Sequence, residues 1–170
     1  MAKQNTLKPE ISKAINAFSQ NNYKEAEKYC SALLSRENDA DANHILGCIR
    51  MREKKFEESI SYINKALLIK KDDVGILISL GCAQSSKKDY SDSINTFEKV
   101  IALKDDISQV HFYLGESYRQ TDQFNKAVDA FKRCLEITPD HIGCQLILGI
   151  TYEELKKFDQ AINFYKSCIE

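Results

Sequence analysis

The sequence of 170 residues contains no tryptophan, only two prolines and only six glycines. Proline breaks a helix from within, so its scarcity leaves room for long helices along most of the chain. Apolar residues never run on for the roughly 18 residues that a membrane-spanning helix needs, and we expect no membrane segment. The first six residues, MAKQNT, lack the apolar core of a signal peptide, which favours a cytoplasmic protein.

Neither sign of charge is in excess, since 24 Lys and Arg residues face 25 Asp and Glu residues and give a formal net charge of -1. A nucleic-acid-binding protein would need a basic face, so this balance argues against nucleic acid as a partner. The charged fraction of 29% and the apolar fraction of 43% are typical of a soluble, mostly helical protein.

The motifs of common active sites and metal sites are also missing. The sequence contains no G-x-S-x-G, no H-E-x-x-H and no phosphate-binding loop, and its six cysteines form neither C-x-x-C nor a zinc-finger spacing. We therefore predict a non-catalytic protein without a cofactor or a metal, in which the cysteines are small apolar packing residues. The pairs Asp72-Asp73 and Asp105-Asp106 are expected in loops, as helix caps and solubilising residues.

What the sequence does contain is one pattern of about 34 residues, written five times. The clearest copy runs from Ser108 to His141, as two stretches with helical spacing around a polar break at 121–123, closed by Pro139. The Leu-Gly pair recurs at Leu46-Gly47, Leu80-Gly81, Leu114-Gly115 and Leu148-Gly149, and the aromatic opening the second stretch at Tyr23, Phe56, Tyr90, Phe124 and Phe158. Each copy leaves apolar side chains that the next copy can cover, which predicts a solenoid.

This pattern resembles the tetratricopeptide repeat family, which places Leu-Gly and an aromatic in the first helix, Ala-x3-Phe in the second, and proline at the end. The clearest copy matches with Leu114-Gly115, Tyr118, Ala127, Phe131 and Pro139, and His111 replaces the family's tryptophan. The resemblance implies an all-α, right-handed superhelical solenoid of five helix-turn-helix repeats in a single domain over 1–170. The repeats are expected at about 7–39, 40–73, 74–107, 108–141 and 142–170, and the first copy is the most divergent.

The pattern predicts ten helices and no strand. The expected helices are near 9–19, 23–35, 41–53, 56–70, 74–87, 90–104, 108–121, 124–137, 142–155 and 158–170. A glycine inside a helix costs roughly 1 kcal/mol relative to alanine. We therefore predict that the glycine of each Leu-Gly pair lets the second helix of the same repeat approach closely.

In this family the first helices line a concave groove, and the resemblance implies which positions face it. These positions hold His44, Cys48, Arg52, Ile78, Cys82, Phe112, Glu116, Arg119, Leu146 and Ile150. A solvated helix face is normally charged, whereas this one is largely apolar, which favours binding of a peptide or helix from a partner protein. The alternative is that tight superhelical curvature packs these side chains against the next repeat.

Cochaperones of this family clamp a C-terminal carboxylate with lysine, arginine and asparagine. The equivalent positions here supply no cation for such a contact, so a chaperone tail is disfavoured as the partner. The hypothesis that follows is a non-catalytic scaffold for protein-protein interaction. The alternative is the N-terminal repeat region of a larger enzyme, such as a bacterial glycosyltransferase or sulfotransferase.

The C-terminal end of the sequence carries a further expectation. Glu170 lies inside the last expected helix, without the polar capping helix that solenoid ends normally need. Ile162 and Ile169 are predicted to lie on a part of that helix which no other repeat covers. We therefore expect either a longer protein or self-association through the C-terminal repeat.

Overall fold

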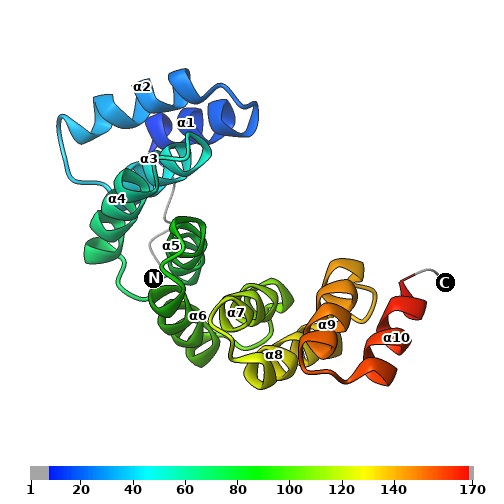
Figure 1. Ribbon diagram of the computed structural model, residues 1–170. Helices are drawn as coiled ribbons and strands as arrows, with labels where there is room; N and C mark the ends of the chain where they lie inside the picture. The colour runs from blue at the N-terminus through cyan, green and yellow to red at the C-terminus, as the bar shows by residue number, and fades with distance from the viewer. Residues whose placement is uncertain (1–7, 169–170) are drawn as a thin grey trace, which may run out of the picture. The chain divides into compact units, whose positions relative to one another are not determined.

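The computed structural model describes residues 8–168, and over this range it consists of ten α-helices without a strand (Figure 1). The helices are α1 (Pro9–Ser19), α2 (Tyr23–Leu34), α3 (Ala40–Arg52), α4 (Phe56–Ile69), α5 (Val74–Lys87), α6 (Tyr90–Leu103), α7 (Ser108–Gln120), α8 (Phe124–Ile137), α9 (Ile142–Glu154) and α10 (Phe158–Ser167). The predicted all-α fold is confirmed, with helix ends shifted by one residue where they differ. The exception is α10, whose predicted end at 170 lies outside the described residues.

The chain divides within α5, after Ala83, into two compact units. The first unit holds α1 to α4 and the start of α5, and the second holds the end of α5 and α6 to α10. Inside each unit the two helices of a pair pack on each other, and a second helix packs on the first helix of the next pair, as α2 does on α3 and α8 on α9. The five helix pairs coincide with the five predicted repeats, and a single domain over 1–170 stays a prediction.

Each helix pair is joined by a turn that contains one residue in the left-handed conformation. These residues are Asn21, Lys54, Lys88, Asp122 and Lys156. In each turn the following N–H donates back to a carbonyl five residues earlier, for example from Asp89 to Gln84 over 2.9 Å. This is the Schellman pattern, which satisfies the last carbonyls of a helix and usually places glycine at the left-handed position. The chain therefore uses lysine three times where glycine is usual.

The core of the first unit is mainly aliphatic. One buried cluster joins α1, α2 and α3 and includes Ile11, Leu33 and Ile49. A second cluster joins α3, α4 and α5 and includes Ile63 and Ile76. All five side chains are at most 2% exposed, so aliphatic contacts supply the apolar burial that stabilises this unit.

The core of the second unit is richer in aromatic rings. Phe97 and Phe131 are fully buried, and Phe97 stacks on Tyr113 with 5.8 Å between ring centroids. Tyr152 stacks on Phe164 at 5.7 Å. Each ring buries a large area and adds a directional contact, so a few side chains hold these helices together.

Gly47, Gly115 and Gly149, three of the four glycines of the Leu-Gly pairs, make close helix contacts, as predicted. A Cβ atom on Gly47 would lie 2.5 Å from Cγ1 of Ile63 in the second helix of the same repeat. At Gly115 a Cβ would lie 2.5 Å from Cε1 of Phe131. Both distances are too short for real atoms, so a larger residue would push the paired helices apart.

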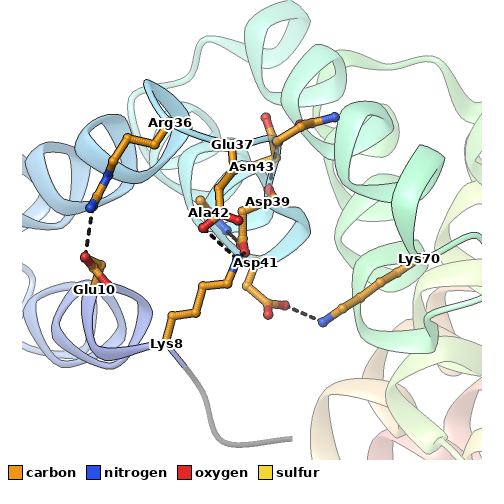
Figure 2. Close-up of polar contacts among 10 residues, drawn as sticks. Lys8, Glu10, Arg36, Glu37, Asp39, Asp41, Ala42, Asn43 and Lys70 are labelled. Carbon is orange, nitrogen blue, oxygen red and sulfur yellow. Dashed lines mark hydrogen bonds and ion pairs between the residues drawn. The ribbon is translucent and has the colours of Figure 1, made fainter.

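Ion pairs fasten α1 to the segment that precedes α3 (Figure 2). Lys8 Nζ lies 2.8 Å from Asp39 and 2.9 Å from Glu37, and Arg36 lies 2.9 Å from Glu10. Asp39 also accepts the N–H of Ala42 and so caps α3. Most of these side chains are largely exposed, so each pair contributes only modestly to stability.

The two aspartate pairs behave differently from each other. Asp73 accepts the N–H of Ile76 over 3.0 Å, which confirms the predicted capping role at the start of α5. Asp105 lies exposed in a loop, as predicted, but the predicted capping role was wrong for it. Its carboxylate pairs with Arg133 of α8 at 2.9 Å, and α7 begins after Ile107, which offers no capping side chain. Two intervening residues place Asp105 too far before the helix to cap it.

Candidate protein-binding faces

In the first unit, His44 of α3 forms a polar contact with α5. Its Nε2 lies 2.8 Å from Oγ of Ser79, and that hydroxyl also donates to the carbonyl of Gly75 over 3.1 Å. Either Nε2–H of His44 or the Ser79 hydroxyl donates in this pair, depending on the imidazole tautomer. Burial lowers the pKa of His44, and the nearby Lys70 acts in the same direction, whereas Asp73 and Asp41 oppose the shift. The imidazole is therefore neutral and links two first helices.

The two predicted thiols of this face, Cys48 and Cys82, are both half-buried. Burial raises the pKa of the Cys82 thiol to about 11 and also raises that of Cys48. A protonated thiol is a weak nucleophile and behaves as a small apolar group. These cysteines therefore offer packing surface and not reactive chemistry.

The remaining predicted residues of this face are Ile78 and Arg52. Ile78 is half-buried on α5, and Arg52 is exposed at the last turn of α3. The face of the first unit is thus small, uncharged in its middle, and positively charged at one end. Such a surface suits a partner with compact apolar side chains.

In the second unit, Phe112 of α7 has two roles. Its ring lies 6.0 Å from that of Phe131 and stacks on His141 at 5.1 Å, yet its side chain stays half-buried. Glu116 and Arg119, one turn further on, form an ion pair with each other at 3.2 Å. Phe112 therefore packs against the core and also lines the predicted face. The charges of Glu116 and Arg119 beside it compensate each other.

Helix α9 carries an apolar stripe on the predicted face. Leu146 is 44% exposed and Ile150 is half-buried one turn later. Ile142, one turn before Leu146, is 63% exposed. Sequence reasoning missed Ile142, although its spacing of four residues from Leu146 places it on the same side of the helix.

His111, at the position of the family's tryptophan, is a core histidine whose ring is hydrogen-bonded. It is 5% exposed, and its Nε2 lies 2.9 Å from the backbone carbonyl of Asp105 and 3.1 Å from its carboxylate.

Within residues 8–168 no group of three or more histidine, cysteine or acidic side chains is arranged to hold a metal ion. In the same range no helix is both long enough and apolar enough to cross a membrane.

Helix α10 has one packed side and one open side. On the packed side, a Cβ on Gly149 would lie 2.6 Å from Cε1 of Tyr165, so α10 lies close against α9 as predicted. On the open side, Phe158 is 58% exposed and Ile162 is 48% exposed. Val128, which holds the place of Ile162 in the preceding repeat, is only 6% exposed because α9 follows it. The other residue predicted to be uncovered, Ile169, lies outside the described residues.

Comparisons with known proteins agree with this architecture. A family model described as "tetratricopeptide repeat" matches residues 40–73, and one described as "anaphase-promoting complex, cyclosome, subunit 3" matches residues 86–168. A search of curated proteins found no match.

Solved structures that share the fold include several of MamA. A structure titled "MamA 41-end from Desulfovibrio magneticus RS-1" matches with a TM-score of 0.88 at 15% identity, covering 96% of each chain. Another, "Crystal structure of MamA", matches with a TM-score of 0.85 at 19% identity, covering 92% of each chain. At such low identity these likenesses establish an all-α repeat solenoid and nothing about a shared partner.

Proposed function

We propose that this chain, which belongs to the tetratricopeptide repeat proteins, binds a peptide or helix of a partner protein on the exposed faces of its first helices. Repeats of this kind indicate a protein-interaction scaffold and are typical of non-catalytic proteins. The observation that carries the finer proposal is the exposure of Leu146, at 44%, on a stripe with Ile142 and Ile150. Large apolar side chains left open on one helix face favour a partner that covers them.

The two units would contribute different chemistry to such binding. The first unit offers the imidazole of His44 and the small thiols Cys48 and Cys82. The second unit offers the α9 stripe beside the ring of Phe112. An amphipathic helix or an extended segment with bulky apolar side chains matches the second unit better, because its apolar positions are the larger and more exposed ones.

The proposal also includes a cytoplasmic location. All six cysteines are free thiols, the form that a reducing compartment maintains. The repeat region of a larger enzyme remains the alternative function, and the full-length gene would decide between the two.

Self-association through the C-terminal repeat is a second part of the proposal. Phe158 and Ile162 lie one helical turn apart on α10 and are 58% and 48% exposed. In a contact with two-fold symmetry each copy would present the same strip, so Ile162 would approach its own symmetry mate. Light scattering should then show an apparent mass that rises with protein concentration for the wild type. The apparent mass of the Ile162→Asp variant should be lower at the same concentration.

Leu146 and Ile162 provide matched tests, because their exposures are nearly equal. We expect Leu146→Asp to abolish retention of partner proteins from a lysate of the native cell, while Ile162→Asp retains them. Circular dichroism should show unchanged helicity for both variants, since an exposed position tolerates a charge. If Leu146→Asp retained the same proteins as the wild type, the binding face would lie elsewhere.

A further inference from the structure

A cavity of about 490 Å³ that is largely open to solvent lies in the first unit. It is lined by Leu34 and Asn38 from α2 and the loop after it, Asn43 from α3, and Tyr62 and Lys65 from α4. None of these residues belongs to the set that faces the groove. The volume lies within the roughly 300–1,000 Å³ of typical ligand sites, so the chemistry of the lining decides what could enter.

Asn43 contributes a hydrogen-bond acceptor that the protein leaves unused. The side chain is 2% exposed and lies beside Asp39 at the start of α3 (Figure 2). Its Nδ2 donates to Oδ1 of Asn38 over 3.0 Å and to the carbonyl of Asp39 over 2.7 Å. Its Oδ1 accepts no hydrogen bond from any residue of the described range 8–168. Among the buried side-chain nitrogen and oxygen atoms of the described residues only Nε of Arg50 lacks a partner, so Oδ1 of Asn43 is an acceptor at the cavity that a ligand N–H would take over from water.

Lys65 brings a positive charge without a carboxylate partner. Its Nζ lies 5.0 Å from the centroid of the Tyr62 ring, and no acidic group of the described residues lies within 4.0 Å of it. The acids that flank Asn38 in the sequence, Glu37 and Asp39, are both paired with Lys8. The Lys65 ammonium is therefore available to an anion.

The amide of Asn38 is oriented by its neighbour. Its Oδ1 receives the hydrogen bond from Asn43, so its Nδ2 remains as a second donor at the cavity. Leu34 and the ring of Tyr62 add apolar surface. The cavity thus offers donors and a cation for an oxyanion, one acceptor for an N–H, and a wall for an aliphatic group.

We propose that this cavity binds an acidic peptide segment. A glutamate or aspartate carboxylate would accept from Lys65 Nζ and Asn38 Nδ2, while a backbone N–H of the same segment would donate to Asn43 Oδ1. A neighbouring aliphatic side chain would pack on Leu34 and Tyr62. This site is separate from the groove of the proposed function, so a failure of one proposal would leave the other unaffected.

The test is a titration of the full chain, followed by nuclear magnetic resonance, with the capped dipeptide acetyl-Leu-Glu-amide. We expect saturable shifts at Asn38, Asn43 and Lys65, and affinity about tenfold lower for acetyl-Leu-Gln-amide, because a charge-assisted hydrogen bond is lost. Lys65→Met should weaken binding of the acidic peptide by about the same factor. Lys28→Met, an exposed lysine of α2 outside the cavity lining, is the matched control and should leave affinity unchanged.

A second variant tests the role of Oδ1 of Asn43 as the acceptor. Asn43→Leu removes Oδ1, and Leu77 already holds the equivalent place in the next repeat, so the fold tolerates this side chain. We expect weaker binding in a variant whose helicity is retained. Shifts that never saturate, or equal losses in Lys65→Met and Lys28→Met, would mean non-specific attraction of charge and would overturn the proposal.

Discussion

The two units build the same repeat with different chemistry, and position 50 shows this most clearly. Arg50 of α3 holds the place that Tyr118 holds in α7. The Arg50 guanidinium pairs with Glu27, whereas the Tyr118 hydroxyl donates to Glu98, so each side chain reaches back to the second helix of the preceding pair. One geometric role is therefore filled by an ionic group in the first unit and by an aromatic group in the second.

The difference extends beyond this position. Arg50 also lies 3.0 Å from Glu53 and 3.1 Å from Glu58, and its side chain is 12% exposed. Its Nε is buried and too poorly aligned for a hydrogen bond with Glu58, so that contact is Coulombic only. Ion pairs tie α1, α2, α3 and α4 in the first unit, whereas ring contacts dominate in the second. The repeat thus specifies where helices must touch and leaves open how they do so.

The largest expected effect comes from removing a core side chain in each unit. Phe131 and Ile63 occupy the same repeat position, both are fully buried, and both face a glycine. Phe131→Ala should lower the free energy of unfolding by about 3–5 kcal/mol and Ile63→Ala by about 2–5 kcal/mol, because each leaves a cavity.

The measurement is denaturant unfolding followed by circular dichroism. Leu103→Ala, at a side chain that is 47% exposed, is the control and should change the midpoint little. If the midpoint of Phe131→Ala matched that of the wild type, the aromatic core would not be what stabilises the second unit.

A smaller effect on the free energy of unfolding is expected when the ion pairs of Arg50 are removed. Arg50→Met keeps the length of the side chain but leaves Glu27 and Glu58 without their cation. Both carboxylates can return to water because they are 35% and 55% exposed, and Glu53 keeps its ion pair with Lys55 at 3.0 Å. We expect a loss of about 1–2 kcal/mol, between the values of surface and buried pairs. Raising the salt concentration should reduce the difference in free energy of unfolding between the wild type and Arg50→Met. The corresponding difference for Tyr118→Phe should not depend on salt.

Much of this architecture could be predicted from the sequence, because the repeat fixes the phase of every helix. The pattern around Leu114-Gly115 and Phe131 gives ten helices and their close pairing, since helical spacing and glycine sites are local properties. The Arg50 cluster could not be predicted in the same way. Arg50 replaces a tyrosine. Glu53 lies three residues after it in the sequence, but Glu27 and Glu58 reach it only through the packing of α2, α3 and α4.

The candidate binding face was predictable in outline only. The resemblance supplies the positions, but the exposure of each one depends on the neighbouring helix. Phe112 is held by His141 and Phe131, which lie 29 and 19 residues away in the sequence, and Ile142 is open because nothing in its own unit covers it. Residue type alone cannot separate these two cases.

A third test uses acid to probe the polar contact of the first unit. His44 has a folded-state pKa below the ordinary value of 6.5, mainly because of burial. The unfolded chain then binds the proton more readily, so stability is full above pH 6.5 and falls as pH drops below it. His44→Gln should flatten this slope in unfolding measurements between pH 7 and about pH 5. An unchanged slope would show that another group causes it.

The smallest effect is expected at the turns, where the two units should behave alike. Lys54 in the first unit and Lys156 in the second adopt left-handed backbone conformations with φ of 60° and 58°. Changing either to glycine relieves strain of about 1–2 kcal/mol but adds freedom to the unfolded chain, so we expect a net gain of about 0.5–1 kcal/mol at each site. Asn21→Gly should gain less, because asparagine tolerates this conformation. Thermal unfolding would check all three variants. A gain confined to one lysine would mean that the units differ in their turns as well as in their cores.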